Sequence, residues 1–221
     1  MNNQIFEQVD VYIKNLLAPE DKALTETVQS IKDEGLPQIS VSANQGKLLQ
    51  IFATICHARK ILELGTLAGY STIWLARSLP KGGKVVTIES DPHHAEVAKK
   101  NINRSGLSEM VDIRIGKAME IIQKMIDQNE SAFDLIFIDA DKPPYAEYFQ
   151  KALELSHSGT IIICDNVIRE GQVLNPEKGD ERVKGVHRLN EMLSKNQQVI
   201  ATILQTVGAK EHDGMAIAVV K

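Results

Sequence analysis

The chain contains FDLIFIDADK at residues 133–142 and TIIICDN at residues 160–166, two aliphatic runs that each end in acid or amide side chains. Such continuous apolar runs are typical of parallel strands that are buried on both faces. In open α/β sheets, ligands bind beyond the carboxyl ends of the strands. We therefore expect the oxygen donors to converge there around Mg²⁺, Mn²⁺ or Ca²⁺ rather than zinc or copper, with Lys142 beside them as a candidate base. The candidate metal ligands are Asp139, Asp165 and Asn166.

From residue 60 onward, segments with strand patterns alternate with segments with helix patterns. The alternation predicts right-handed crossovers and a parallel sheet, and hence an α/β fold. The expected strands are 61–64, 84–89, 111–115, 133–139 and 160–164. The helices between them are expected to start near Tyr70, Pro92, Ala118 and Pro144.

The two ends of the chain add helices and a hairpin to this core. Helical spacing of apolar residues predicts an amino-terminal cap of helices over residues 1–58, within a single domain that spans 1–221. Near the carboxyl end we expect a helix at 182–195, followed by two strands that form a terminal hairpin and make the sheet mixed. Those strands are 199–204 and 215–220, with Asp213-Gly214 at the turn between them.

Composition sets broad limits on function. The 221 residues include 29 acidic and 25 basic side chains, and the net charge of −4 argues against broad electrostatic attraction to nucleic acid or anionic membranes. Neither a secretory signal pattern nor an apolar run of membrane-spanning length is visible. Cys56 and Cys164 lie in separate apolar segments and are expected to be core residues rather than a disulfide, which favours a cytoplasmic protein.

The segment ILELGTLAGYS at 61–71 is typical of a strand, a glycine turn and the start of a helix. Glu89 ends the next expected strand, where a carboxylate can bind both ribose hydroxyls of a nucleoside-containing cofactor. Gly65 and Gly69 do not satisfy G-x-G-x-x-G, and the Glu63 carboxylate would repel a pyrophosphate but attract an ammonium or sulfonium group. The pattern therefore favours S-adenosylmethionine over NAD. The simpler alternative is that the glycines only make a turn and that both glutamates cap helices.

Taken together, these motifs resemble the cation-dependent O-methyltransferases related to catechol and caffeoyl-coenzyme A O-methyltransferases, in a small bacterial form. The matching pieces, between Val41 and the end of the chain, are VSANQGKLL, ELGTLAGYST, VVTIESD, FDLIFIDADKPPY and IIICDN. The resemblance implies a Rossmann-like class I methyltransferase fold with helices on both faces of a seven-stranded, mostly parallel sheet whose last strand is antiparallel. It also implies a homodimer.

The resemblance assigns roles residue by residue. It makes Lys142 the general base, places Glu89 at the ribose and Ala118 at the adenine, and has Tyr148 close over the cofactor. It implies that Asp139, Asp165 and Asn166 bind the divalent cation. The residues implied at the methionine end of the cofactor are Val41, Glu63, Gly65, Thr66, Ser71 and Asp139.

We thus expect an S-adenosylmethionine- and cation-dependent O-methyltransferase that acts on vicinal hydroxyls of catechol-type phenolics, caffeoyl or flavonoid-like. The cation would act as Lewis acid and template, and Lys142 would accept the phenolic proton. Three alternatives stay open: methylation of a hydroxylated uridine in tRNA, an NAD-dependent oxidoreductase, and a cofactor-binding module without catalysis. Basic side chains that could face RNA are Lys178, Arg182, Lys184 and Arg188.

Overall fold

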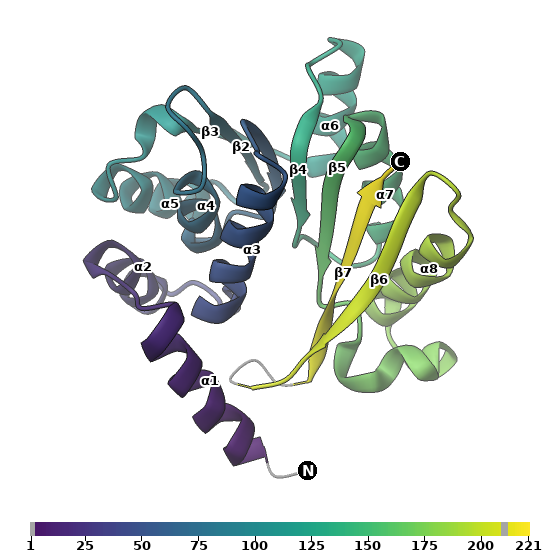
Figure 1. Cartoon of the computed structure of the whole chain (residues 1–221), viewed down its shortest axis with the longest axis horizontal. Helices are drawn as coiled ribbons and strands as arrows, with labels where there is room; N and C mark the ends of the chain where they lie inside the picture. The colour runs from purple at the N-terminus through teal and green to yellow at the C-terminus, as the bar shows by residue number, and fades with distance from the viewer. Residues whose placement is uncertain (1–2, 209–211) are drawn as a thin grey trace.

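A computed structural model describes residues 3–208 and 212–221 of the chain. Its centre is a seven-stranded sheet in the order β3-β2-β1-β4-β5-β7-β6 (Figure 1). Strand β7 pairs antiparallel with both β5 and β6, and all other pairs are parallel. This confirms the expected α/β class I methyltransferase topology. The strands are β1 (Lys60–Leu64), β2 (Lys84–Glu89), β3 (Val111–Ile115), β4 (Phe133–Ile138), β5 (Ser156–Asp165), β6 (Val199–Thr206) and β7 (Asp213–Val220).

The terminal hairpin differs from the sequence prediction at its turn. Strands β6 and β7 do pair antiparallel, but the pairing extends to Thr206 opposite Asp213 and to Gln205 opposite Gly214. The prediction that Asp213-Gly214 forms the turn was therefore wrong, since both residues belong to β7. The reason is that register across a hairpin is set by the partner strand, which a single strand's sequence does not reveal.

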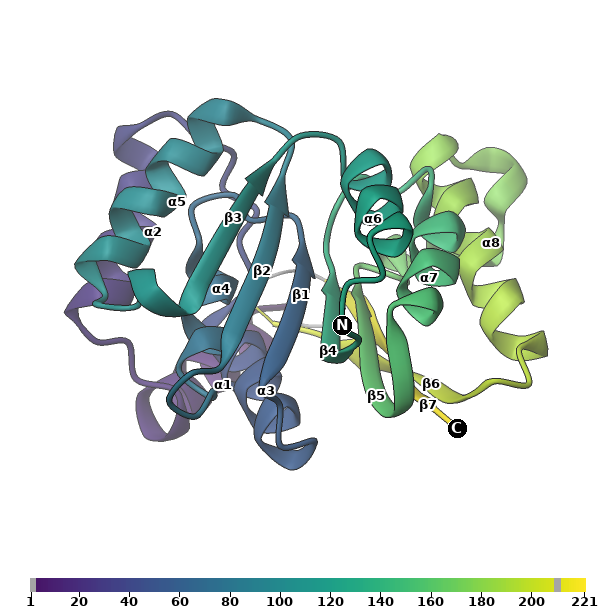
Figure 2. The same ribbon diagram turned by 90° about the horizontal axis from the view of Figure 1, so that it is seen from above.

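Helices cover both faces of the sheet, as Figure 2 shows from above. Helices α6, α7 and α8 pack their apolar side chains on one face, while α2, α3, α4 and α5 pack on the other and α1 leans on α3. The helices are α1 (Asn3–Leu17), α2 (Lys22–Asp33), α3 (Ala43–Ile55), α4 (Tyr70–Ala76), α5 (Pro92–Arg104), α6 (Ala118–Asp127), α7 (Tyr145–Glu154) and α8 (Glu181–Lys195). Short 3-10 turns are η1 (Ser108–Met110), η2 (Arg169–Leu174) and η3 (Pro176–Lys178).

Local sequence explains where several helices begin. Ser42 forms a reciprocal capping box with Gln45 at the start of α3, which satisfies two backbone donors of the first turn. Asp91 caps α5 directly before Pro92, a residue suited to the first helical position. These contacts depend only on neighbours in the chain, and they fix where α3 and α5 begin.

One edge of the sheet can bring functional side chains from several strands together. Five adjacent strands, β3 to β5, run parallel, so their carboxyl ends and the turns that follow meet along a single edge. Cys56 and Cys164 are both free thiols, as predicted. Within the described ranges, no helix combines the length and apolarity needed to cross a lipid bilayer.

Candidate active site

The turn after β4 places an acid and a lysine together at this edge. The N–H of Asp139 donates to the carbonyl of Leu64, the last residue of β1, at 2.9 Å, which anchors the turn to the neighbouring strand. Lys142 is buried, and its Nζ lies 2.9 Å from Oδ1 of Asp139. The predicted base and one predicted metal ligand are therefore ion-paired.

The second acid comes from the end of β5, the strand that lies beside β4 in Figure 1. Asp165 is almost fully buried, and its Oδ1 accepts the N–H of Asn166 at 2.8 Å. Its backbone carbonyl lies 3.3 Å from Nζ of Lys142, so both strand ends meet at the same ammonium. Burial, together with the charge of Asp139, raises the pKa of Asp165 above its usual value.

This donor set fits a hard divalent cation. The Asp139 carboxylate pairs with the Lys142 ammonium, and within the described ranges the buried Asp165 carboxyl at the end of the neighbouring strand forms no ion pair with a base. Asn166 adds an amide oxygen on a backbone with φ of 59°, in the left-handed region that asparagine tolerates. Among the residues that the structure describes, no three His, Cys, Asp or Glu side chains form a group that could hold a metal ion. Asp139, Asp165 and Asn166 would hold the cation through oxygen, as Mg²⁺ or Ca²⁺ requires.

Tyr145 joins this cluster, although the sequence analysis assigned it no role. It is fully buried at the start of α7, and its hydroxyl accepts a hydrogen bond from Nζ of Lys142 at 2.6 Å. The same oxygen lies within hydrogen-bond distance of the carbonyls of Ile138 and Asp165. Burial raises the pKa of Tyr145 well above its usual value, so the hydroxyl keeps its proton and can donate it to a carbonyl. The signal available in the sequence was a tyrosine three residues after the lysine.

The glycine turn after β1 touches the acidic turn directly. Gly65 has φ of +94°, and a Cβ built there would lie 2.1 Å from the backbone oxygen of Asp139. Only glycine permits both this conformation and this approach of the two backbones. The predicted cofactor turn and the predicted metal turn are therefore in contact, which brings the two halves of the expected chemistry together.

Glu63 lies beneath this turn and has no exposed surface. Its carboxylate accepts hydrogen bonds from the hydroxyls of Ser71, at 2.6 Å, and Thr87, at 2.7 Å, and from Thr72. Burial raises the pKa of Glu63 to about 7, although the three hydroxyls oppose this shift. The structure thus brings the predicted residues Glu63 and Ser71 into direct contact with each other, and sequence reasoning missed the two threonines.

Glu89 holds the backbone of the glycine turn. Its Oε2 accepts the N–H groups of Thr66 at 3.1 Å and Leu67 at 2.8 Å, and its Oε1 accepts the N–H of Asp91 at 3.0 Å. A carboxylate has about four acceptor positions, and Nδ1 of His94 lies 3.7 Å from Oε1, so at most one position remains for a further donor. Leu67 has φ of 50°, which is rare for a leucine, and the bond to Glu89 helps to keep it there.

Three further residues were predicted to contact the cofactor, namely Ala118, Val41 and Tyr148. Ala118 is the first residue of α6, directly after the turn in which the N–H of Gly116 donates to the carbonyl of Glu89. Val41 is buried immediately before α3. Tyr148 is buried on α7, and its hydroxyl donates to Oδ1 of Asp141 at 2.6 Å.

With this geometry established, comparison with known proteins decides the family. A family model described as O-methyltransferase matches residues 14–219. The chain belongs to the O-methyltransferase family. A catechol O-methyltransferase from Niastella koreensis is 58% identical to it over 221 residues, which is all of both chains.

Solved structures of other family members agree. The O-methyltransferase from Bacillus cereus in complex with SAH superimposes with a TM-score of 0.96 at 46% identity, over 99% of this chain and 100% of that one. The O-methyltransferase TomG from Streptomyces achromogenes, in complex with SAM, has a TM-score of 0.96 at 42% identity, over 100% of this chain and 99% of that one. The protein is an S-adenosylmethionine-dependent O-methyltransferase of the catechol and caffeoyl-coenzyme A type, which goes against an NAD-dependent oxidoreductase or a non-catalytic module.

In this O-methyltransferase, Asp213 supports the candidate site from β7. Its Oδ1 accepts the N–H groups of Ile168 at 2.8 Å and Arg169 at 3.0 Å, shortly after the ligand candidate Asn166. The carboxylate therefore shapes the segment that follows β5. This explains why an acid stands at a strand start where the sequence suggested a turn.

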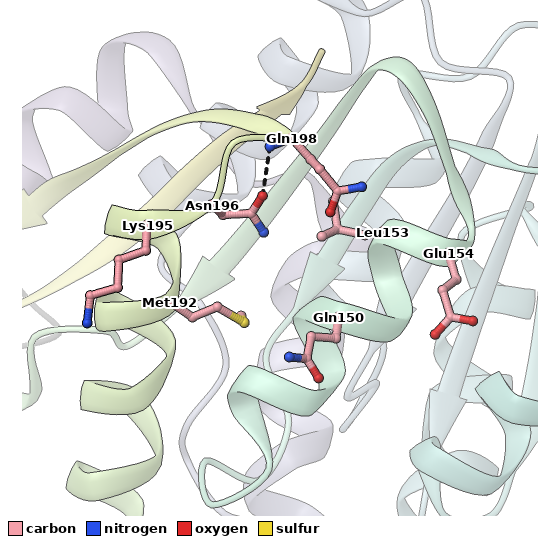
Figure 3. A pocket seen from close by; sticks show the side chains of 7 residues that line it. All are labelled: Gln150, Leu153, Glu154, Met192, Lys195, Asn196 and Gln198. Carbon is pink, nitrogen blue, oxygen red and sulfur yellow. Dashed lines mark hydrogen bonds between the residues drawn. The ribbon is translucent and has the colours of Figure 1, made fainter.

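A hollow between the carboxyl-terminal ends of α7 and α8 lies away from this edge of the methyltransferase (Figure 3). Among the side chains that line it, Lys195 points away from Glu154 and pairs with Glu191, and Asn196 accepts the N–H of Gln198. No acid, base and nucleophile converge among these lining residues. The lining residues are Gln150, Leu153, Glu154, Met192, Lys195, Asn196 and Gln198.

Proposed function

We propose that this enzyme methylates one of two vicinal hydroxyls on a catechol-type phenolic that is caffeoyl or flavonoid-like. The reaction would use a divalent cation, for which Mg²⁺ is the first candidate and Mn²⁺ or Ca²⁺ are the alternatives. The observation that carries the proposal is that Nζ of Lys142 contacts both the carboxylate of Asp139 and the backbone carbonyl of Asp165, where β4 and β5 end. Two acids and an amide at this place are more than binding of S-adenosylmethionine requires. Oxygen ligands of this kind suit a cation that is chelated by two adjacent hydroxyls.

The cation, when bound, supplies Lewis-acid stabilisation of a phenolate and a template for the acceptor. Asp139, Asp165 and Asn166 are its proposed ligands. Nζ of Lys142 donates to the carboxylate of Asp139, to the hydroxyl of Tyr145 and to the backbone carbonyl of Asp165. Lys142 is the proposed base for the phenolic proton.

The cofactor is proposed to lie over the glycine turn, within reach of the acidic turn. Glu89 would offer its remaining acceptor position to the ribose, and Ala118 would lie at the adenine. Tyr148 is proposed to close over the cofactor from α7. The methionine end would be surrounded by Val41, Glu63, Gly65, Thr66, Ser71 and Asp139. Such placement brings the methyl group and the acceptor oxygen into the near-attack geometry that methyl transfer needs.

A tRNA acceptor receives less support. Arg188 donates to the carbonyl of Pro143 at 2.7 Å, and Lys184 pairs with Glu181 at 2.9 Å. Two of the four basic side chains considered for an RNA-facing edge are therefore engaged within the protein. This pairing, with the net charge of −4, favours a small phenolic acceptor.

The proposal is tested by methylation of caffeate-like and flavonoid catechols with metal-free enzyme. We expect turnover when Mg²⁺ is added and loss of turnover in excess EDTA, because the hydroxyl is a poor nucleophile while protonated. Binding of S-adenosylhomocysteine, measured by calorimetry in EDTA, is the control for intact protein. Monophenols, which cannot chelate through two oxygens, should react poorly. Full catechol turnover in EDTA would refute the role of the cation.

We also propose a homodimer. Exposed apolar side chains on α1 recur at helical spacing, so one stripe of the helix is left uncovered by the residues that the structure describes. A second copy of the chain would cover such a stripe. The residues of this α1 stripe are Ile5, Val9, Tyr12 and Leu16.

A further inference from the structure

We propose that the Tyr145 hydroxyl is the positioning group that holds Lys142 and the ends of β4 and β5 in one arrangement. The inference rests on the proposed function, because it concerns the base and the ligands named there. Tyr145 makes no contact of its own with reacting atoms in this proposal. It acts through Lys142 and through the backbone that carries Asp139, Asp165 and Asn166.

The hydroxyl has a place for each of its partners. One lone pair accepts the hydrogen bond from Nζ of Lys142 at 2.6 Å, the shortest of the three that this ammonium donates. The single proton points to the carbonyl of Asp165 at 2.8 Å or that of Ile138 at 2.9 Å. Ile138 is the last residue of β4 and Asp165 is the last residue of β5. One oxygen atom therefore touches both strand ends and the candidate base.

Packing alone does not require this hydroxyl. Tyr145 heads the fully buried side chains in size, and a phenylalanine ring would fill the same space. A buried hydroxyl costs stability unless it has partners, and here all its partners belong to the candidate active site. The ammonium of Lys142 also lies 4.4 Å from the centre of the Tyr145 ring, which adds a cation–π contact. The tyrosine thus orients the lysine by two separate interactions, of which only one survives in phenylalanine.

Loss of the hydroxyl should loosen the lysine and both ligand-bearing turns at once. Without it, Asp139 becomes the main partner of the ammonium, and the carboxylate competes less well as a ligand. The strand ends also lose the bridge between them. Removal of a residue that orients metal ligands typically lowers metal affinity or activity about 10- to 100-fold. Cofactor affinity should change little, because the glycine turn is held by Glu89 rather than by Tyr145.

The chain offers a matched control at the opposite end of the same two strands. The hydroxyl of Thr160 is fully buried, donates to the carbonyl of Phe133 at 2.7 Å and accepts the N–H of His157 at 3.0 Å. It therefore bridges β4 and β5 as Tyr145 does, but far from Lys142. Thr160→Val removes this hydroxyl at nearly constant volume, just as Tyr145→Phe removes the other.

The experiment compares the wild-type enzyme, Tyr145→Phe and Thr160→Val. It measures the Kd of Mn²⁺ and of S-adenosylhomocysteine by calorimetry, kcat and KM for a catechol, and the melting temperature. We expect Tyr145→Phe to raise the Kd of Mn²⁺ and to lower kcat, each about 10- to 100-fold, with the Kd of S-adenosylhomocysteine unchanged. Thr160→Val should lower the melting temperature without affecting Mn²⁺ binding or kcat.

Each outcome decides the proposal. Wild-type values of both kcat and the Kd of Mn²⁺ in Tyr145→Phe would overturn it, as would an equal loss in Thr160→Val. If Tyr145→Phe does not fold, a ring-fluorinated tyrosine at position 145, which weakens the oxygen as an acceptor, should lower kcat in the same direction; an unchanged kcat would overturn the proposal. A wild-type enzyme that neither binds Mn²⁺ nor responds to EDTA would instead contradict the proposed function, and kcat of Lys142→Ala with and without Tyr145→Phe would still test the positioning role. In that cycle, the loss caused by Tyr145→Phe should be smaller in the Lys142→Ala background, where only the effect on the two strand ends remains, and an equal loss in both backgrounds would contradict positioning of Lys142.

Discussion

At the scale of single residues, two acids of the candidate site form hydrogen bonds with the protein itself, in addition to the ligand contacts proposed for them. Glu63 accepts hydrogen bonds from hydroxyls on α4 and β2, and Glu89 accepts backbone N–H groups of the glycine turn. Both were expected to face a cofactor. The contacts of Glu89 fix the turn on which that cofactor is proposed to lie, and those of Glu63 join the following helix α4 to β2, so that this part of the site is preorganised before anything binds.

Glu63 should make the stability of the enzyme depend on pH. Its pKa is raised by burial from 4.5 to about 7, so the folded state binds the proton more tightly than the unfolded chain. Stability contributed by the protonated form is therefore present below pH 4.5 and is lost as pH rises toward 7. At about 1.4 kcal/mol for each tenfold change in affinity, the loss is about 3 kcal/mol. Glu63→Gln should remove this dependence.

The measurement is urea unfolding of wild-type enzyme and Glu63→Gln without cofactor, from pH 4.5 to pH 8. The free energy of unfolding of the variant should gain about 3 kcal/mol relative to wild type over this range. Two parallel pH profiles would show that Glu63 has an ordinary pKa in the folded state.

At the scale of elements, the two edges of the sheet have different tasks. The carboxyl ends of β1, β4 and β5 carry the candidate site, whereas their amino ends are joined by Asp134. One oxygen of Asp134 accepts the N–H groups of Arg59 at 2.7 Å and Lys60 at 2.8 Å, and the other lies 2.9 Å from Nε2 of His157. Burial would raise the pKa of Asp134, but these donors hold it below its ordinary value. Its contribution to stability is thus present above pH 4 and is lost as pH falls through the lowered pKa.

Asp134→Ala should lower the free energy of unfolding at pH 7 by about 1–3 kcal/mol, since hydrogen bonds to a charged acceptor are lost between three strands. The Kd of S-adenosylhomocysteine should stay at the wild-type value, because the cofactor edge is at the other end of the sheet. Asp112→Ala is a suitable control, since Asp112 pairs with Arg114 on the partly exposed β3 and should change stability by less than about 1 kcal/mol. A weakened cofactor affinity in Asp134→Ala would contradict this separation of tasks.

At the scale of the whole molecule, α1 is the helix that leaves most of its large apolar side chains exposed. Figure 1 shows it extending away from the sheet and its flanking helices. Asn44 fastens it to α3 by donating to the carbonyl of Asp10 at 3.0 Å. Tyr12 and Leu16 of the α1 stripe are 64% and 59% exposed, which is costly for large apolar side chains in water. This exposure supports the proposed homodimer.

Light scattering after size exclusion should therefore give a mass of twice the 24.5 kDa of one chain. Leu16→Glu places a charge within the stripe and should shift the enzyme toward the monomer. Gln8→Glu adds the same charge to an exposed polar position of α1 and should leave the mass unchanged. A wild-type mass of 24.5 kDa at micromolar concentration would rule out the dimer.

Much of this architecture could be predicted from local patterns in the chain. Apolar runs, glycine turns and capping residues determined the parallel strands and the starts of α3 and α5, because these depend on neighbours within a few residues. The meeting of Asp139 with Asp165 also followed, since the carboxyl ends of adjacent parallel strands share one edge.

The amino-acid sequence by itself thus determined the elements, their class of fold and the edge at which chemistry gathers. Only the tertiary structure decided which groups form hydrogen bonds with one another there. Tyr145 bonds to Lys142, Thr72 and Thr87 bond to Glu63, and Asp213 bonds to the backbone after Asn166. Such partners come from elements far apart in the chain or from a helix whose orientation is set by packing. Their pairing depends on register and distance between elements, which local periodicity does not encode.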